Sequence, residues 1–365
     1  MPMKDVAPIA VTMGEPAGVG PELIMKSWCM RDQSGAFLDP FFVLGDPELF
    51  KVRAKDIDLE VEVRVCTPEE ACEVFPVALP LVSFDYSVGT NPGTANPGDA
   101  SVVISIIEKA VDLVKSGAAS GMVTGPVSKW CLLAAGFKWL GHTSYLGHLA
   151  EKKYGSHLCD IFSFGRQEGF SSDLSGHGFT PVMLLLNQYL RSVPITTHVS
   201  VREVPDILTQ DLIVSTSRIV ARDFRRFFGI EHPRLAMLGL NPHAGENGLL
   251  GHEEELIIKP AISSLLSDGI EVTGPHSADT IFCKDKLSDY DVAMAMYHDQ
   301  GIIPVKALSF HDTVNVTLGL PFVRTSPGHG TSFDIAGKGI ARQDSFVKAI
   351  ELAGKLARIQ RREIG

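Results

Sequence analysis

Short apolar segments alternate with longer amphipathic segments along this 365-residue chain, and that alternation limits the folds open to it. The short segments are rich in Val, Ala, Met or Phe and run into turns of Gly, Pro or Asp, which indicates strands buried on both faces of a parallel sheet. The long segments, residues 97–117 and 253–269, have helical spacing and end at a glycine suited to a left-handed C-cap. The predicted strands are residues 7–13, 41–46, 121–126, 234–245 and 290–301.

This pattern predicts the α/β fold class with parallel sheets, in which ligands bind at the carboxyl ends of the strands. The length exceeds the commonest size of a single domain and favours two domains. No internal repeat and no Gly/Ser linker marks a boundary between them.

Composition excludes several classes of protein. The net charge of -10 disfavours general binding to nucleic acid or to anionic membranes, because both select for basic surfaces. The six cysteines are dispersed without a C-x-x-C pair, which indicates reduced thiols. The chain has no signal-peptide pattern and no run of about eighteen apolar residues, so we expect a cytoplasmic protein without a membrane span.

Three histidines stand where predicted strands give way to loops: His198, His243 and His298. Strand-end imidazoles in a parallel-sheet protein can converge on one divalent ion such as zinc, with a position left for a substrate oxygen. Each histidine could equally serve the structure through hydrogen bonds. Asp279 could approach the same metal, or it could cap a helix.

Several polar residues lie in apolar or glycine-rich surroundings and could hold an anion. Lys306, Asn315 and Arg324 occur in a strand-rich region, where a phosphate or carboxylate is one candidate partner and a surface carboxylate is another. His142 and Thr143 follow a glycine and could donate to a phosphate.

The glycine-rich loop at residues 327–341 would let backbone approach a planar or phosphorylated ligand closely. The residues of interest there are His329, Gly330, Gly337 and Asp334, of which Asp334 could accept a hydrogen bond from a ribose hydroxyl. The same composition is compatible with a structural turn.

These segments occur in an order that resembles the 4-hydroxythreonine-4-phosphate dehydrogenase family of vitamin B6 biosynthesis. The resemblance covers nearly the whole chain, and the final loop is similar to the adenosine-binding loop of isocitrate and isopropylmalate dehydrogenases. The motifs that carry it are GEPAGVGPE, VTGPVSK, GHTSYL, TTH, NPHAGE, YHDQG and VNVTLGLPFVRTSPGHGTSFDIAGKG.

The resemblance implies two α/β/α domains of the isocitrate/isopropylmalate dehydrogenase type, with the active site in the cleft between them. We expect a discontinuous cofactor-side domain of residues 1–125 and 300–365. Residues 126–299 would form the domain with the dimer interface and the metal ligands.

The resemblance also implies a reaction. A secondary alcohol of a small phosphorylated hydroxy-amino acid, 4-phosphooxy-L-threonine, is oxidised with NAD or NADP, and the keto acid then loses carbon dioxide. One divalent metal per site, zinc, magnesium or cobalt, is expected at active sites shared within a homodimer. Alternative substrates are threonate or erythronate 4-phosphate or a carboxylated cis-dihydrodiol; a non-catalytic module that binds a metal or phosphorylated ligand is the alternative from another class.

Family positions carry over to individual residues. The metal ligands would be His198, His243 and His298; the substrate would contact His142, Thr143, Lys306, Asn315 and Arg324; the catalytic residues would be Lys306 and Asp279; the cofactor would contact His329, Gly330, Asp334 and Gly337. The chain departs from the family pattern at Ser144, where an acidic residue is common, and at residues 163–180, which resemble an insertion.

Overall fold

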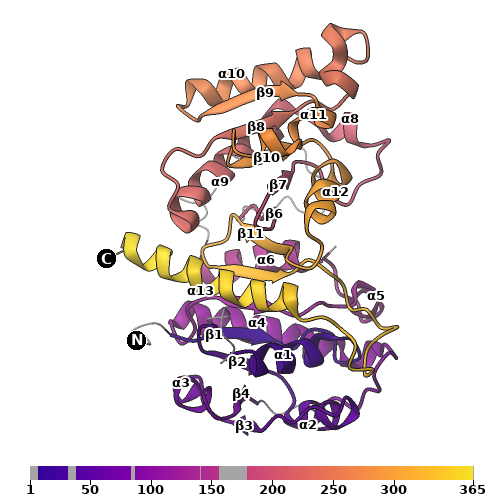
Figure 1. Ribbon diagram of the computed structural model, residues 1–365, viewed down its shortest axis with the longest axis vertical. Coiled ribbons are helices and arrows are strands. Elements are labelled where there is room, and N and C mark those ends of the chain that lie inside the picture. Colours follow the sequence, from indigo (N-terminus) through magenta and orange to yellow (C-terminus); the bar gives the residue numbers. More distant parts are fainter. Residues whose placement is uncertain (1–6, 32–37, 84–86, 140, 156–178, 365) are drawn as a thin grey trace. The chain divides into compact units, whose positions relative to one another are not determined.

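Two compact α/β units make up the chain, each a sheet with helices on both faces (Figure 1), and the predicted fold class is confirmed. The computed structural model describes residues 7–31, 38–83, 87–139, 141–155 and 179–364. Unit 1 consists of residues 1–154 and 322–365, and unit 2 of residues 155–321. Most of the segment 163–180 lies outside the described residues. No helix within the described ranges is long and apolar enough to cross a bilayer.

Unit 1 contains a parallel sheet with strand order β3-β4-β2-β1-β5-β12. The predicted strands at 7–13, 41–46 and 121–126 are confirmed, and their residues are buried because helices cover both faces. The elements are β1 (Ile9–Thr12), α1 (Gly20–Cys29), β2 (Phe41–Leu44), α2 (Pro47–Asp56), β3 (Val63–Val65), α3 (Ala71–Val74), β4 (Leu79–Val82), η1 (Pro97–Asp99), α4 (Ala100–Ser116), β5 (Met122–Thr124), α5 (Lys129–Ala134), α6 (His142–Tyr154), β12 (Arg324–Pro327) and α13 (Asp344–Ile364).

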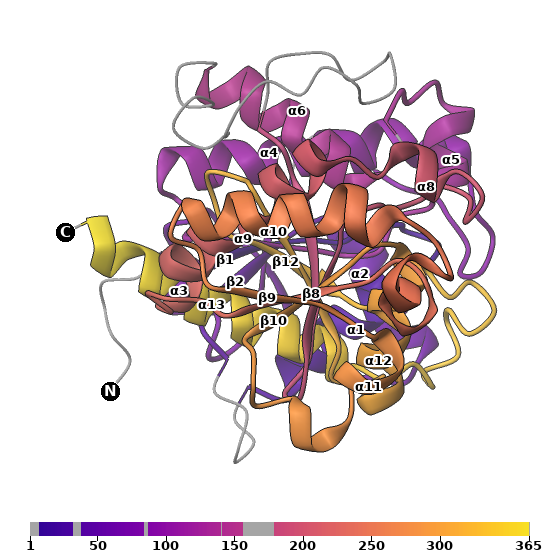
Figure 2. The same ribbon diagram turned by 90° about the horizontal axis from the view of Figure 1, so that it is seen from above.

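Helix α4 shows why the sequence forms these elements. Asn96 accepts a hydrogen bond from the N–H of Gly98 at the preceding 3-10 turn, and Gly117 ends the helix at φ 81°. Its buried side chains recur at helical spacing, with Val103, Ile107 and Val111 on the face that packs against the sheet. Figure 2 shows α4 and α6 on one face of the unit 1 sheet and α1 and α13 on the other.

Unit 2 contains a mixed sheet with strand order β11-β6-β7-β10-β8-β9. The strands β7, β10, β8 and β9 run parallel, and the predicted parallel strands at 234–245 and 290–301 correspond to β8 and β10. Strand β6 is antiparallel to both β7 and β11. The elements are β6 (Val182–Leu186), β7 (Arg191–Pro194), α8 (Val204–Ile207), α9 (Gln210–Phe228), β8 (Leu235–Leu238), η2 (Pro242–Gly248), η3 (Glu254–Ile258), α10 (Lys259–Ser267), β9 (Val272–His276), α11 (Ala278–Ile281), η4 (Lys284–Lys286), β10 (Val292–Ala295), α12 (His298–Leu308) and β11 (Val314–Leu318).

The limits of the units differ from the expected positions near residues 125 and 300. Residues 126–154 lie with unit 1 because α6 packs against α4, where the hydroxyl of Tyr145 donates to Glu108 at 2.7 Å. Strand β11 lies with unit 2 because it pairs along its whole length with β6. Tertiary packing therefore decides which unit residues 126–154 and β11 belong to. The local sequence pattern does not predict this packing.

Candidate active site

Four of the predicted site residues follow four neighbouring strands of unit 2. His198 follows β7, His298 follows β10, His243 follows β8 and Asp279 follows β9. These strands are parallel and lie in the order β7, β10, β8, β9, so their carboxyl ends share one edge of the sheet. The topology thus gathers residues that are far apart in the sequence.

His198 and His298 lie beside each other at adjacent strand ends. Their ring centroids are 5.8 Å apart, and both rings line a surface pocket together with Thr196, Tyr297 and Asp299. Nδ1 of His298 lies 2.7 Å from Oδ1 of Asp299. A carboxylate at Nδ1 favours the tautomer with its proton there, which directs the Nε2 lone pair to a metal or a substrate.

His243 lies in a turn of left-handed backbone, which we call the left-handed turn (residues 243–247). The φ values of these five residues lie between 44° and 79°. Four of them are not glycine, and an L-residue pays about 1–2 kcal/mol for this conformation. Such a turn persists only where its surroundings hold it, and strained backbone of this kind is concentrated at functional sites.

A buried carboxylate supports the left-handed turn. Oε1 of Glu254 accepts the backbone N–H of Asn241 at 2.8 Å, and its Oε2 accepts from Nδ2 of Asn241 at 2.9 Å. A Cβ added at Gly245 would lie 2.6 Å from Oε2 of Glu254. The turn therefore packs on this carboxylate only with glycine at position 245. Glu254 was not among the predicted site residues, because its one signal in the sequence is its place in an acidic run.

His243 lies near Asp279, because η2, which carries the histidine, packs against α11. Its Nδ1 lies 3.2 Å from Oε2 of Glu246, which favours the same tautomer as in His298. The hydroxyl of Ser277 donates to Asp279 and lowers the pKa of that carboxyl group, and the nearby His243 acts in the same direction. Within the described residues, no three His, Cys, Asp or Glu side chains are close enough to hold one metal ion.

Lys306 and Asn315 also belong to unit 2. Lys306 lies half-buried on α12 with its Nζ 5.5 Å from the centroid of the Phe310 ring. Oδ1 of Asn315, on β11, is buried and accepts no hydrogen bond from the described part of the chain. A buried carbonyl oxygen without a donor is costly, so a ligand donor would stabilise it.

Unit 1 holds a buried positive charge. Arg324 on β12 is buried, and its Nε and Nη2 donate to Oγ1 of Thr124 at 3.1 and 2.6 Å. Nε2 of His142 is buried and has no hydrogen-bond partner among the described residues. Burial, and then the charge of Arg324, lower the pKa of His142 to about 3, while burial lowers the pKa of Arg324 to about 10. At neutral pH, Arg324 is charged and His142 is neutral, and Thr143 follows His142 in the first turn of α6.

The predicted cofactor residues lie in a loop without helix or strand between β12 and α13 (residues 328–341). Nδ1 of His329 lies 3.0 Å from the carbonyl oxygen of Gly330. A Cβ at Gly330 would meet nothing within 4 Å, so this backbone borders open space, and Asp334 is exposed. Gly330 and Asp334 are placed where a ligand could reach them, whereas His329 is half-buried and its Nε2 is buried.

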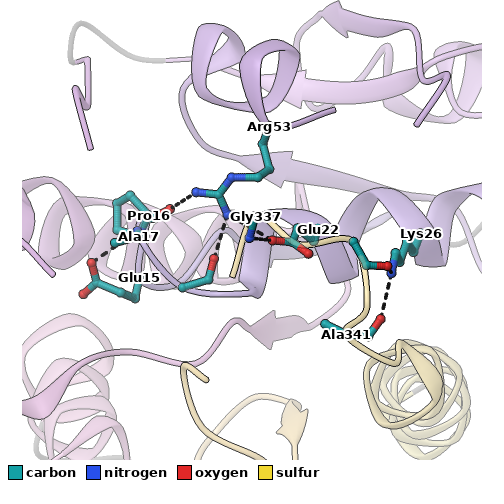
Figure 3. A network of polar contacts seen from close by, with 10 residues as sticks. Glu15, Pro16, Ala17, Glu22, Lys26, Arg53, Gly337 and Ala341 are labelled. Carbon is teal, nitrogen blue, oxygen red and sulfur yellow. Dashed lines mark hydrogen bonds and ion pairs between the residues drawn. The ribbon is translucent and has the colours of Figure 1, made fainter. Parts of the chain in front are cut away.

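Gly337 has a different environment, and with it come charged residues that were not predicted from the sequence. A Cβ at Gly337 would lie 2.6 Å from Cβ of Pro92, and its N–H donates to Glu22. Glu22 and Arg53 are buried, and Lys26 donates to the same loop (Figure 3). Packing thus accounts for Gly337, and its N–H is already used within the chain.

A family model described as pyridoxal phosphate biosynthetic protein PdxA matches residues 37–353. The chain belongs to this family. The match spans the left-handed turn, the strand-end histidines and Arg324, so both groups of site residues lie within the PdxA region. A 4-hydroxythreonine-4-phosphate dehydrogenase of Methylorubrum extorquens is 45% identical over 356 residues, which are 97% of this chain and 95% of that protein. That of Bradyrhizobium diazoefficiens is 44% identical over 358 residues, 96% of this chain and 97% of its own.

Solved structures agree with the assignment to the PdxA family. The crystal structure of 4-hydroxythreonine-4-phosphate dehydrogenase from Klebsiella pneumoniae matches with a TM-score of 0.76 and 36% identity, over 96% of this chain and 99% of that chain. A terephthalate 1,2-cis-dihydrodiol dehydrogenase from Burkholderia xenovorans LB400 matches less closely, with a TM-score of 0.59 and 25% identity over 96% and 98% of the two chains.

Proposed function

We propose that this PdxA family member is an NAD(P)-dependent, divalent-metal-dependent 4-hydroxythreonine-4-phosphate dehydrogenase. It oxidises 4-phosphooxy-L-threonine to 2-amino-3-oxo-4-phosphooxybutanoate, which loses carbon dioxide to give 3-amino-2-oxopropyl phosphate. In the oxidation, the alcohol carbon gives a hydride to the nicotinamide and the hydroxyl oxygen gives up a proton. The observation that carries the proposal is the 45% identity, across nearly the whole chain, to a protein of that name.

The metal ligands in this proposal are His198, His243 and His298. The donor set fits, because carboxylates at Nδ1 of His243 and His298 direct both Nε2 atoms outward. These residues would hold one divalent ion, zinc, magnesium or cobalt, which would supply Lewis-acid polarisation of the substrate hydroxyl and charge stabilisation during decarboxylation. Asp279, with its lowered pKa, is ionised at neutral pH and orients the ligands, and Lys306 receives or returns the proton.

The substrate-binding residues in this proposal are Arg324, His142 and Thr143 of unit 1 and Asn315 and Lys306 of unit 2. Arg324 supplies the positive charge, since a buried guanidinium gains most from a charged hydrogen bond. His142 stays neutral, so its unpartnered Nε2 can exchange a hydrogen bond with the ligand without adding charge. The dinucleotide, which accepts the hydride, would lie along His329, Gly330 and Asp334, with Gly337 shaping the loop.

The proposed protein is a homodimer whose metal sites are shared. Within the described residues of one chain, His198 lies beside His298, and no three His, Cys, Asp or Glu side chains are close enough to hold a metal ion, so a second copy would supply the missing ligand. Leu249, at 81% exposed, and the exposed Leu250 follow the left-handed turn and offer an apolar surface for that copy to cover.

The activity is tested by NADH or NADPH formation with purified, metal-loaded protein. The substrates are 4-phosphooxy-L-threonine, threonate 4-phosphate, erythronate 4-phosphate and a carboxylated cis-dihydrodiol, each with and without a chelator. Chelator-sensitive turnover of the first compound supports the proposal. Turnover of another compound alone would assign the same chemistry to a different substrate, and silence with all four would favour a binding protein without turnover.

Shared sites are tested by mixing two inactive variants, His243→Asn and His298→Ala. If each metal site takes His298 from one subunit and His243 from the other, a mixed dimer has one intact site, so activity returns partly on mixing. A matched mixture of His198→Ala with His298→Ala should stay inactive, because both changes fall on the same side of the site. Full activity of a monomer would contradict the shared arrangement.

A further inference from the structure

The 328–341 loop is held mainly from outside itself. Its internal backbone hydrogen bonds run from Ile335 N to Ser332 O and from Lys338 N to Ile335 O, and neither extends into regular structure. An irregular segment of this length loses conformational entropy when it becomes ordered. Contacts with the rest of the unit must offset that loss.

Helix α1 supplies two charged contacts to the end of the loop. Glu22 and Lys26 are four residues apart, so they lie on one face of the helix. Glu22 accepts the N–H of Gly337, and Nζ of Lys26 donates to the carbonyl oxygens of Gly339 and Ala341 at 2.6 and 2.8 Å (Figure 3). Opposite charges thus bind backbone groups of opposite polarity in one short stretch.

Helix α2 connects this arrangement to the glycine-rich segment before α1. Nη1 of the buried Arg53 lies 3.5 Å from Oε1 of Glu22 and donates to the carbonyl oxygen of Gly18 at 2.9 Å. Its Nη2 donates to the carbonyl oxygen of Pro16 at 3.0 Å (Figure 3). The backbone N–H of Val19 in turn donates to Thr331 O at 3.0 Å, so the first part of the loop is tied to the segment before α1 and its end to α1 itself.

Stability alone is a weak reason for this arrangement. Burial removes water from Arg53 and lowers its pKa, and the charge of Glu22 acts in the opposite direction. The ion pair therefore has a desolvation cost. Apolar residues of similar volume often replace a buried ion pair without loss of stability. Charged hydrogen-bond partners have a second effect, because they fix the position of the backbone N–H and carbonyl groups that they bind.

We propose that Glu22, Lys26 and Arg53 are positioning residues that hold the 328–341 loop in its dinucleotide-binding shape before the cofactor arrives. The inference rests on the proposed function, in which this loop binds NAD(P). A loop ordered in advance loses less entropy on binding, so these residues set cofactor affinity without touching the cofactor or the reacting atoms.

The principal test is Lys26→Met, because Lys26 is only partly buried and its loss leaves the core intact. Lys26→Arg keeps the charge and the donors and should restore the wild-type behaviour. Lys51→Met is the matched control, since Lys51 on α2 pairs with the exposed Glu48 of its own helix. Hydrogen exchange of the cofactor-free protein and the Kd for NAD and NADP by calorimetry are measured on all of them.

In Lys26→Met, amides of residues 335–341 should exchange faster than in the wild type. The Kd for the dinucleotide should rise about ten- to a hundred-fold, as expected for charged hydrogen bonds. The kcat at saturating dinucleotide and the KM for the phosphorylated substrate should not change, because the loss is confined to cofactor binding.

Wild-type exchange and Kd in Lys26→Met would overturn the positioning role, as would a general rise in exchange over all of unit 1. Glu22→Gln gives a second measurement, because it keeps an acceptor for Gly337 but removes the counter-charge of Arg53; faster exchange confined to residues 16–19 and 335–341 supports the proposal. Failure of the wild type to bind either dinucleotide is a separate result, and it overturns the proposed function on which the inference rests.

Discussion

Arg324 and His142 in unit 1 differ in burial from His243 in unit 2. In unit 1, Arg324 is 3% exposed and His142 keeps a buried ring nitrogen, whereas in unit 2 the His243 side chain is 65% exposed. Buried polar groups are tolerated only where the fold or a ligand satisfies them. Exposed imidazoles are hydrated and need no partner within the fold.

This contrast separates two kinds of functional residue. Substitutions of the buried Arg324 and His142 in unit 1 should alter both the free energy of unfolding and substrate binding, because the same contacts serve both. Changes at the strand ends of unit 2 should remove activity and leave the free energy of unfolding nearly unchanged.

The largest effect on activity is expected for His243→Asn. Asparagine tolerates left-handed backbone, so the left-handed turn should persist while the imidazole is lost. Turnover should fall by orders of magnitude, since a metal contributes several kcal/mol to charge stabilisation. Metal content by mass spectrometry should fall as well, and the unfolding midpoint in urea should stay close to that of the wild type. Wild-type turnover with a depleted metal would remove His243 from the ligand set.

Arg324→Ala should have the next largest effect and should act on two quantities. Loss of a charged hydrogen bond to the substrate should reduce kcat/KM by about 1.5–3 kcal/mol in activation free energy, mainly through KM. The vacated space and the unpaired hydroxyl of Thr124 should also lower the free energy of unfolding. Steady-state kinetics and urea unfolding measure the two losses. A kinetic loss without any loss of stability would erase the contrast between the units.

His142 should make the stability of the protein depend on pH. Its folded pKa of about 3 lies below the ordinary value of 6.5, so the unfolded chain binds the proton first. The contribution of neutral His142 is present above pH 6.5 and is lost as the pH falls towards 3, at no more than about 1.4 kcal/mol per pH unit. Urea unfolding at steps across this range should therefore give a flatter profile for His142→Asn. Parallel profiles for the variant and the wild type would show that this histidine is not buried in the neutral form.

The smallest effect on the free energy of unfolding is expected for Ala244→Gly. A matched change in a right-handed helix serves as the comparison. Ala244→Gly relieves the steric cost of the left-handed turn but adds entropy to the unfolded chain, so the free energy of unfolding should change by no more than about 0.5 kcal/mol. The same change at the exposed Ala307 in α12 should destabilise by about 0.5–1 kcal/mol. Equal losses at both positions would mean that the turn is not left-handed in solution.

Local patterns in the sequence predicted the elements well where one physical signal dominated. The continuous apolar runs predicted β1 and β10, and the spacing of apolar residues with Gly117 predicted α4. The antiparallel direction of β6 was not predicted, because an apolar run contains no information about the direction of the strand relative to its neighbours.

For the candidate site, local sequence patterns named candidate residues but did not predict the contacts between them. The strand-end histidines were named because parallel strands place their ends together, but which ends are neighbours depends on the strand order β7-β10-β8-β9, which no local signal carries. Glu22 and Arg53 meet across separate helices, and Glu254 supports a turn that precedes it. Such contacts follow from the tertiary fold and leave no trace in the spacing of residues.

The left-handed turn is, in its backbone, a short piece of the mirror image of an ordinary helical turn. An amino acid of opposite chirality prefers this region, because the clash of an L-residue's Cβ becomes a favourable arrangement for its mirror image. In a protein assembled by chemical ligation, D-alanine at position 244 should therefore stabilise the turn that carries His243, whereas D-alanine at position 307 should disrupt α12. At position 244, the chirality of the residue should therefore affect the stability of the left-handed turn even though the side chain stays the same.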